Sequence, residues 1–202
     1  MKIIKFTGKN FTEVNKIVVK SIREGGVVVF PTDTVYGLVG DAQNGKAVRK
    51  IFKIKKRPKN KPLPIFISDI KMAKEIAYID KKQEKFLKKV WPGKITAVLK
   101  SKVQSSKSKI YGVDKDTIAL RIPKYGLLLN LVKQLNRPLA QTSANISGRP
   151  APWDMEEILK QFAGKKYQPD LIVRRLTSNN SAKNKPSKII DLTVFPPKIL
   201  RP

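Results

Sequence analysis

Two hydrophobic patterns alternate along this chain, and together they predict an α/β fold. Short runs of β-branched and other apolar residues indicate strands, whereas an apolar residue every three or four positions indicates an amphipathic helix. The predicted strands are Met1–Phe6, Val27–Phe30, Leu63–Ile67, Ile95–Leu99, Thr117–Ile122, Pro138–Gln141, Leu171–Val173, Lys188–Leu192 and Lys198–Leu200. The predicted helices are Thr12–Glu24, a helix that begins after Asn44, Ile70–Ala77, Lys82–Val90, Tyr125–Leu135 and Met155–Phe162. Because no Gly/Ser linker or internal repeat divides the sequence, we expect residues 1–202 to form a single domain, a twisted mixed β-sheet flanked by helices.

The stretch Val27–Leu38 combines a buried strand with a polar exit. Its first four residues are apolar, which is typical of a strand covered on both faces, and Pro31 ends the strand because it has no N–H group to donate. Thr32, Asp33 and Thr34 then place two hydroxyls and a carboxylate at the end of the strand, where open α/β sheets build ligand sites. An ordinary strand-to-loop exit would have the same pattern, and the sequence assigns no role to Asp33.

Residues 44–62 contain nine basic residues and no acidic one. At the end of the predicted helix, Lys55 and Arg57 can point together at one anion, Arg57 by a bidentate contact and Lys55 as a point charge. Such a pair suits the oxygens of a polyphosphate. A solvated helix end would explain the same residues, because cations are favoured at helix C-termini.

Two further segments carry polar groups suited to a nucleotide or another anion. Thr142–Gly148 follows a predicted strand and gathers small hydroxyl and amide side chains around a tight turn, a pattern also found in purely structural Asx or Ser turns. Arg121 lies within an otherwise apolar strand, so it must meet either a buried acid or an anionic ligand. Ser187 and Arg201 add anion-compatible groups farther along the chain.

The amino-acid composition limits both the partners and the catalytic groups that this chain can use. The chain has 43 Lys plus Arg against 15 Asp plus Glu, and this net charge of +28 favours nucleic acid or nucleotide phosphates as partners. A generally Lys-rich proteome would give the same total. The absence of histidine and cysteine excludes imidazole bases, Ser-His-Asp triads, disulfides and thiolate chemistry. A reaction catalysed by positive charge around phosphates fits what remains.

Several common classes of protein are not expected. The sequence has no P-loop, no Gly-x-Gly-x-x-Gly fingerprint and no metal-ligand spacing, which argues against a conventional kinase, a dehydrogenase or a bound metal. No apolar stretch is long enough to span a membrane, and the N-terminal residues are too short and interrupted for a signal peptide. We therefore expect a cytoplasmic protein.

Six segments carry a resemblance to a known family. They are Pro31–Leu38, Lys55–Pro58, Trp91–Gly93, Thr117–Arg121, Thr142–Gly148 and Pro186–Ser187. In this order they closely resemble the YrdC-like family, which includes the threonylcarbamoyl-AMP synthases, and in particular its compact single-domain members with a basic central cavity. The resemblance implies that L-threonine, bicarbonate or CO2, and ATP with its Mg2+ are condensed to threonylcarbamoyl-AMP and pyrophosphate. The product would serve N6-threonylcarbamoyladenosine formation, so tRNA and the downstream threonylcarbamoyl-transfer proteins are expected partners.

The resemblance also implies roles for individual residues. The L-threonine-binding residues would be Thr32, Thr34, Arg121, Gln141 and Ser187. The ATP-binding residues would be Lys55, Arg57, Lys61, Thr117, Ser143, Asn145 and Arg201. Lys55 and Arg57 would also be catalytic, because they would stabilise charge on the phosphates and on the leaving pyrophosphate. The chain departs from the family pattern at Lys61, Phe66 and Lys188.

Two other functions fit parts of the sequence. A non-catalytic module on the same fold that binds double-stranded RNA or tRNA would account for the charge of +28. A carbamoyl-transfer domain of the kind found within larger hydrogenase-maturation proteins would share the fold, but we expect this chain to lack the partner domains of those proteins.

Overall fold

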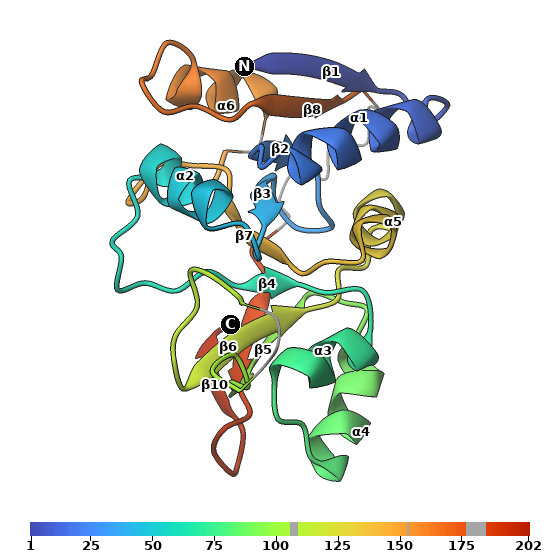
Figure 1. The fold of residues 1–202 in the computed structure, drawn as a ribbon, viewed down its shortest axis with the longest axis vertical. Coiled ribbons are helices and arrows are strands. Elements are labelled where there is room, and N and C mark those ends of the chain that lie inside the picture. The colour runs from blue at the N-terminus through green and yellow to red at the C-terminus, as the bar shows by residue number, and fades with distance from the viewer. Residues whose placement is uncertain (106–108, 153, 177–184) are drawn as a thin grey trace.

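The computed structural model describes residues 1–105, 109–152, 154–176 and 185–202, which form a ten-stranded sheet with helices around it (Figure 1). The strands are β1 (Lys2–Phe6), β2 (Val28–Phe30), β3 (Gly37–Asp41), β4 (Ile65–Phe66), β5 (Ile95–Lys100), β6 (Thr117–Arg121), β7 (Leu139–Ser143), β8 (Leu171–Arg175), β9 (Lys188–Asp191) and β10 (Lys198–Arg201). The helices are α1 (Phe11–Arg23), α2 (Gly45–Lys55), α3 (Ile70–Ile76), α4 (Lys81–Val90), α5 (Gly126–Leu135) and α6 (Met155–Phe162).

The sheet is mixed, and its strand order is β1-β8-β2-β3-β7-β4-β6-β5-β9-β10. The pairs β1–β8, β2–β8, β4–β6 and β5–β9 are parallel, and the other neighbours are antiparallel. In Figure 1, α1, α2 and α6 lie at the end that contains β1, β8 and β2, whereas α3 and α4 lie at the end that contains β5 and β6. The α/β fold predicted from the sequence, with its mixed sheet and flanking helices, is confirmed.

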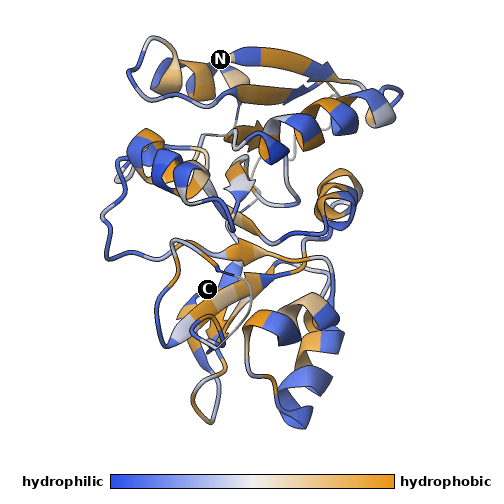
Figure 2. Cartoon of the chain, in the orientation of Figure 1, coloured by the Kyte–Doolittle hydropathy of each residue, from blue (hydrophilic) through white to orange (hydrophobic). Residues whose placement is uncertain are grey.

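The apolar faces predicted from the sequence pack into one core. α1 turns Val14, Val18 and Ile22 inward, and all three residues of β2 are buried. Figure 2 shows apolar strands inside and polar outer faces on the helices. Each fully buried aliphatic side chain contributes roughly 1.5–3 kcal/mol, so this core fixes the strands whose ends carry polar residues. Within the described residues, no helix is both long and apolar enough to cross a lipid bilayer.

The sequence does not predict β3, although all five of its residues are buried. Its two glycines and its terminal acid hide the alternation that indicates a strand. At Gly40, an added Cβ would lie 3.4 Å from Ile51 Cδ1 and 3.5 Å from Ala47 Cβ, so β3 packs closely on α2. Asp41 accepts a hydrogen bond from Arg137 Nη1 at 2.8 Å. Close packing on α2 and an ion pair with a residue far along the sequence therefore stabilise this strand. Neither feature can be read from the hydrophobicity of neighbouring residues.

The predicted strands differ from the observed ones by one or two residues at their ends, and two of these differences have a local cause. β7 runs to Ser143 rather than ending at Gln141, because the unpredicted β3 pairs with it to that point. Thr142 therefore belongs to the strand, and the tight turn begins later. β4 is Ile65–Phe66 within the predicted Leu63–Ile67, and it begins only after Pro64 because proline has no N–H to offer the sheet.

Candidate active site

One threonine hydroxyl holds the loop between β2 and β3 in place. Thr32 Oγ1 accepts the Thr34 backbone N–H at 2.9 Å, donates to the Val35 carbonyl oxygen at 2.8 Å and lies 2.9 Å from Thr34 Oγ1. These bonds occupy the Thr32 hydroxyl within its own loop, so the hydroxyl fixes the backbone that follows Pro31. Thr34 is buried, and its hydroxyl contacts the next part of the site.

Arg121, at the end of β6, is a buried cation beside a buried acid. Its Nη2 lies 2.6 Å from Asp33 Oδ1, and the two side chains are only 2% and 7% exposed. Arg121 Nε donates to the Gly93 carbonyl oxygen at 2.8 Å and Nη1 donates to Thr34 Oγ1 at 3.3 Å. The second Asp33 oxygen accepts the Lys124 backbone N–H at 3.0 Å. Of the two partners that the sequence left open for Arg121, the structure supplies the buried acid, and it gives Asp33 a role.

The guanidinium group of Arg121 retains some bonding capacity. Its bonds to the described residues use three of its five N–H groups. Burial lowers the pKa of Arg121, and the adjacent Asp33 opposes that effect. The ring of Phe66 lies 5.8 Å from Arg121 Cζ, so this departure from the family pattern places an aromatic face on the cation.

A second cation, Lys55 in the last turn of α2, is buried among neutral oxygens. Its Nζ donates to the carbonyl oxygen and Oγ of Ser143 at 2.9 and 3.2 Å. It also donates to the carbonyl oxygen and Oδ1 of Asn145 at 3.0 and 2.8 Å. Ser143 Oγ in turn donates to Asn145 Oδ1 at 2.6 Å, which closes the turn around the ammonium group. The structure thus brings together three residues that the sequence placed in one ATP site.

The ammonium group of Lys55 has no carboxylate within salt-bridge distance among the described residues. Burial, and secondarily the charge of Arg57, lower the pKa of Lys55 to about 7. Neutral oxygens compensate poorly for the water that the ammonium group has lost. A bound anion would favour the charged form and raise this pKa again.

Helix α2 is capped at its C-terminus by Lys56, which has a left-handed backbone conformation with φ of 51°. Arg57 lies in the loop that follows. Arg57 Nε donates to the Lys61 carbonyl oxygen and Nη2 to the Pro62 carbonyl oxygen, both at 2.9 Å. Burial lowers the pKa of Arg57, whose charge also acts on Lys55. Lys55 and Arg57 are therefore close enough for the charge of one to affect the pKa of the other. The Lys61 side chain itself is exposed, and the contact uses its backbone.

A third polar group comes from β5, β9 and β10. Ser187 is buried just before β9, and its Oγ lies 2.9 Å from Thr96 Oγ1. Arg201 donates from Nε and Nη2 to the Ser187 carbonyl oxygen at 2.9 and 2.6 Å, and from Nη2 to Ser187 Oγ at 3.2 Å. Besides burial, the charge of Arg201 lowers the pKa of Arg121, so these two guanidinium groups share a region of the molecule.

The β2–β3 loop and the turn after β7 lie side by side. Gly37 of β3 pairs with Ser143 of β7, and the Ala144 backbone N–H donates to the Tyr36 carbonyl oxygen at 2.8 Å. The lysine group and the arginine–aspartate group therefore adjoin along the β3–β7 pair.

Two predicted site residues lie within strands that also carry residues of these groups. Thr117 begins β6, so the rise of a strand places it about 13 Å from Arg121 at the other end. Gln141 is half-buried within β7, where its backbone N–H donates to the Pro64 carbonyl oxygen at 2.9 Å. No contact among the described residues joins either side chain to the buried cations.

Sequence reasoning misses Asp33, Thr96 and Tyr36. A polar residue inside an apolar strand requires a buried partner, and Thr96 in β5 carries this signal. Asp33 could be recognised only by its distance to Arg121 in space. The Tyr36 hydroxyl accepts the Arg175 backbone N–H at 3.2 Å, and burial raises the Tyr36 pKa.

The charge of the site is overwhelmingly positive. Its cations are the buried Lys55 and Arg121, the half-buried Arg57 and the exposed Arg201, against the carboxylate of Asp33 among the described residues. Within the described residues, no three His, Cys, Asp or Glu side chains are grouped to hold a metal ion. The arrangement can bind a ligand with several anionic oxygens and stabilise negative charge that develops on it.

Comparison with known proteins gives consistent matches. A family model for Sua5, YciO and YrdC, described as "Telomere recombination", matches residues 20–202. The chain is 38% identical to the threonylcarbamoyl-AMP synthase of Pyrococcus abyssi (strain GE5 / Orsay) over 183 residues, which cover 90% of this chain and 51% of that protein. It is 36% identical to the threonylcarbamoyl-AMP synthase of Bacillus subtilis (strain 168) over 145 residues, covering 71% of this chain and 42% of that protein. The chain thus spans about half the length of these curated relatives.

A solved structure supports the same relationship. The crystal structure of P. abyssi Sua5 complexed with L-threonine matches with a TM-score of 0.85 and 33% sequence identity. The match covers 100% of this chain and 57% of that chain. The similarity therefore includes every element around the described site.

Proposed function

Because this chain belongs to the Sua5–YciO–YrdC family, we propose that it condenses L-threonine, bicarbonate or CO2, and ATP to threonylcarbamoyl-AMP and pyrophosphate. The observation that carries this proposal is a buried lysine at the end of α2, which has no carboxylate partner among the described residues. The turn that holds its ammonium group adjoins a second, arginine-based group. A triphosphate and an amino acid could occupy these two groups at the same time. The names of the aligned relatives support the same reaction.

L-threonine is assigned to the arginine-based group. The two N–H groups of Arg121 that its described contacts leave unused suit a carboxylate. Thr34, which Arg121 contacts, and Ser187, which Arg201 contacts, would supply hydroxyls. In this proposal Asp33 does not touch the substrate. It keeps Arg121 oriented, with its charge compensated, before L-threonine arrives.

The proposed chemistry needs no histidine base. The amine of L-threonine adds to CO2 and loses one proton to solvent, giving a carbamate; starting from bicarbonate, the same product forms with release of water. A carbamate oxygen then attacks the α-phosphorus of ATP. The bond between that phosphorus and the α,β-bridging oxygen breaks, and pyrophosphate leaves with the bonding electrons. Holding the two reactants in line is the main task of the site.

Lys55 and Arg57 are assigned to the phosphates of ATP. Phosphate oxygens would replace neutral acceptors of Lys55 by charged ones, which strengthens each hydrogen bond. Ser143 and Asn145, which already position Lys55, would line the same nucleotide. Mg2+ would arrive with ATP, held by phosphate oxygens and water.

The product's mixed anhydride is reactive, so a transfer step must consume it. We place that step in tRNA modification, with tRNA and threonylcarbamoyl-transfer proteins as downstream partners in the cytoplasm. A purely non-catalytic RNA-binding role has less support, since it leaves the acid-free Lys55 and the Arg121 group without a purpose.

Pyrophosphate release tests the proposal. It should require L-threonine, bicarbonate and ATP together, and omission of any one should abolish it. Lys55→Ala or Arg57→Ala should reduce turnover by at least about tenfold, which corresponds to about 1.4 kcal/mol of transition-state stabilisation. Thr117→Ala is the comparison from within the predicted set. No contact among the described residues joins its side chain to Lys55, Arg57 or Arg121, so we expect a smaller effect.

Two results would contradict this function. One is pyrophosphate release at the same rate without L-threonine. The other is unchanged turnover in both the Lys55 and the Arg57 variants, which would remove these residues from the mechanism.

A further inference from the structure

The outer face of α2 carries a row of cations that takes no part in the site described above. The α2 basic row consists of Lys46, Arg49, Lys50 and Lys53. Its i, i+3, i+4, i+7 spacing places all four side chains on one side of the helix. The opposite side of α2 is buried in the core. One helix therefore presents Lys55 to the candidate active site and a separate cationic face to solvent.

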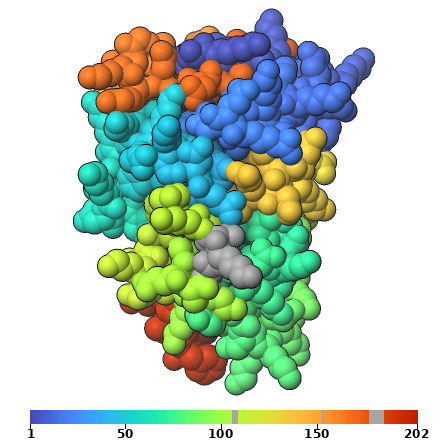
Figure 3. All heavy atoms as spheres, in the orientation of Figure 1, coloured from blue at the N-terminus to red at the C-terminus, as the bar shows by residue number. Residues whose placement is uncertain are grey.

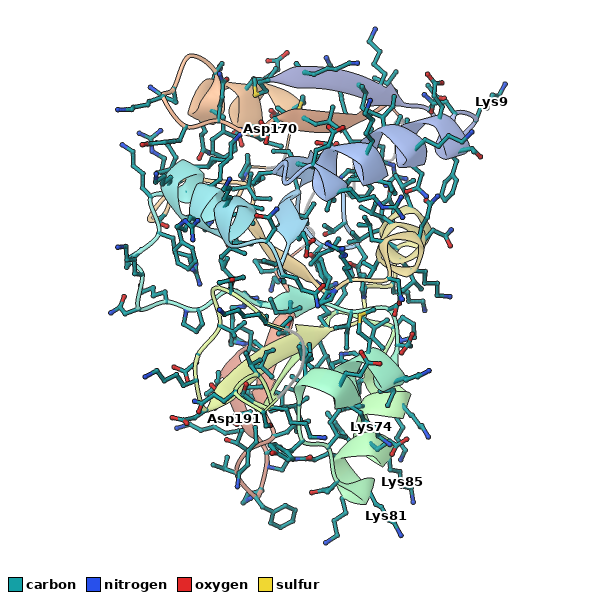
Figure 4. All side chains as sticks on the ribbon, viewed as in Figure 1. Lys9, Lys74, Lys81, Lys85, Asp170 and Asp191 are labelled. Carbon is teal, nitrogen blue, oxygen red and sulfur yellow. The ribbon has the colours of Figure 1, made fainter. Side chains whose placement is uncertain are left out.

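The α2 basic row forms one wall of a surface pocket with a volume of about 550 Å³. The segment after α6 forms the other wall, and the residues that it contributes are Lys166, Tyr167, Gln168, Pro169 and Asp170. In the space-filling view the orange segment with α6 lies against the cyan α2 (Figure 3). Figure 4 labels Asp170 between these two elements. Two segments distant in the sequence thus build one concave, cationic surface.

The positive charge of this pocket is largely uncompensated. Asp170 is the one acid among the described lining residues, and its Oδ1 accepts Lys50 Nζ at 2.5 Å. Its Oδ2 accepts the Val27 backbone N–H at 2.8 Å, so this carboxylate is already engaged on both oxygens. No carboxylate of the described residues pairs with the other three cations of the row or with Lys166.

An exposed aromatic ring completes the pocket. Tyr167 is 39% exposed, and Lys53 Nζ lies 5.0 Å from its ring centroid. Lys166 Nζ lies 5.9 Å from the same centroid. Cations interleaved with an accessible aromatic face are the combination that binds the backbone and the bases of an unpaired nucleic-acid strand.

We infer that this pocket binds a single-stranded stretch of nucleic acid, with the α2 basic row on its phosphates and Tyr167 against a base. From Lys46 to Lys53 the helix rises about 10 Å. The row therefore extends along a line, as the phosphates of a polynucleotide backbone do. A small polyphosphate would need cations that converge on one point, whereas these are spread along a line. The inference does not depend on adenylate formation.

Fluorescence anisotropy with a fluorescein-labelled single-stranded RNA tests this inference. The pocket variant is the triple substitution Lys46→Gln, Arg49→Gln, Lys53→Gln in the full chain. Its affinity for the RNA should fall by at least about tenfold at about 0.1 M salt, and the slope of log K against log salt should decrease by about two. Pyrophosphate release should stay unchanged, because the row does not face the active site.

A matched control comes from α4 at the other end of the molecule. Lys81, Lys85 and Lys89 are exposed, share one helical face and have no carboxylate partner among the described residues, and Figure 4 labels the first two. The triple substitution Lys81→Gln, Lys85→Gln, Lys89→Gln removes the same charge and should change affinity by less than about twofold. Equal losses in the two variants would mean that only the overall charge attracts RNA, and would overturn the inference. So would a wild-type chain that shows no binding.

A second substitution probes the base contact and guards against misfolding. Tyr167→Ala removes no charge and should weaken single-stranded RNA binding by about fivefold or more, the loss of one stacking contact. It should leave binding of a fully paired RNA duplex unchanged. Equal effects on both RNAs, or no effect on either, would contradict a single-strand site. Thermal unfolding of each variant shows whether the fold is intact.

Discussion

At the scale of single residues, Arg121 and Lys55 are buried cations that the fold stabilises in different ways. Arg121 has a carboxylate at 2.6 Å, so it stays charged without a ligand. Lys55 has only neutral acceptors, and its pKa falls to about 7. One group is therefore a permanent anchor, and the other changes its charge when an anion arrives.

The Asp33–Arg121 pair predicts a large effect of a small change. Asp33→Asn leaves Arg121 as an uncompensated buried charge, so the free energy of unfolding should fall by about 3–5 kcal/mol. Urea denaturation measures this loss. Glu75→Gln, at an exposed position on α3, should change it by less than about 0.5 kcal/mol.

A double substitution separates stability from activity at the same pair. Asp33→Leu with Arg121→Met removes both charges and should recover most of the lost stability, but it should not restore L-threonine-dependent turnover. Recovery of both properties would contradict the assignment of Arg121 to the substrate carboxylate.

The low pKa of Lys55 predicts a pH dependence of ATP binding. An anion favours the protonated form, whereas the free protein loses that proton above a pKa of about 7. ATP affinity should therefore fall as the pH rises from about 7 to about 9, approaching tenfold per pH unit. Calorimetric titration at several pH values measures it.

The control for this titration is Lys55→Met, which should bind ATP weakly and with little pH dependence over the same range. A wild-type affinity that stays constant, or an equal slope in the variant, would show that Lys55 does not titrate on binding.

At the scale of elements, α2 organises both the candidate active site and the cationic pocket. Gly112 packs on this helix: an added Cβ would lie 2.7 Å from Val48 Cγ1 and 3.2 Å from Phe52 Cε2. Its φ of +74° is left-handed as well. Position 112 therefore combines a steric and a conformational requirement for glycine.

Alanine substitutions test the two requirements separately. Gly112→Ala should lower the free energy of unfolding by more than about 2 kcal/mol. Gly164→Ala, with φ of +66° and no atom within 4 Å, should cost only the conformational term of about 1–2 kcal/mol. Gly126→Ala, with open space and no positive φ, should be neutral or slightly stabilising. Equal losses at positions 112 and 164 would contradict the close packing on α2.

Most elements could be predicted from the sequence because their hydrophobic periodicity is local. α1 and α2 show clear apolar stripes, and Asn44 does cap α2, accepting the Lys46 and Ala47 backbone N–H groups. β3 could not be predicted, since Gly40 is explained by its contact with α2 rather than by its neighbours in sequence.

The candidate site likewise contains residues that could be predicted from the sequence and a residue whose role could not. The group of Lys55, Ser143 and Asn145 was predicted through the resemblance to a family, whereas the partner of Arg121 was not. That partner lies 88 positions away in the sequence, and only the fold brings the two together. Long-range pairing of this kind leaves no periodic signal.

At the scale of the whole molecule, the cations behind the net charge of +28 lie in different environments. Some cations are buried around the candidate active site, some line the pocket beside α2, and others, such as Lys74 and Lys88, pair with Glu84 on the surface. The first group of cations suits a nucleotide, the second suits a nucleic-acid strand, and the third stabilises the surface helices.

The central claim is that the two adjoining cation groups join L-threonine, a one-carbon acid and the adenylate of ATP. The most direct measurement is mass spectrometry of the products formed from ATP, L-threonine and 13C-labelled bicarbonate. We expect an adenylate that contains L-threonine and one labelled carbon, formed together with pyrophosphate and absent in Lys55→Ala. An adenylate without the label, or hydrolysis of ATP with no such adduct, would contradict it.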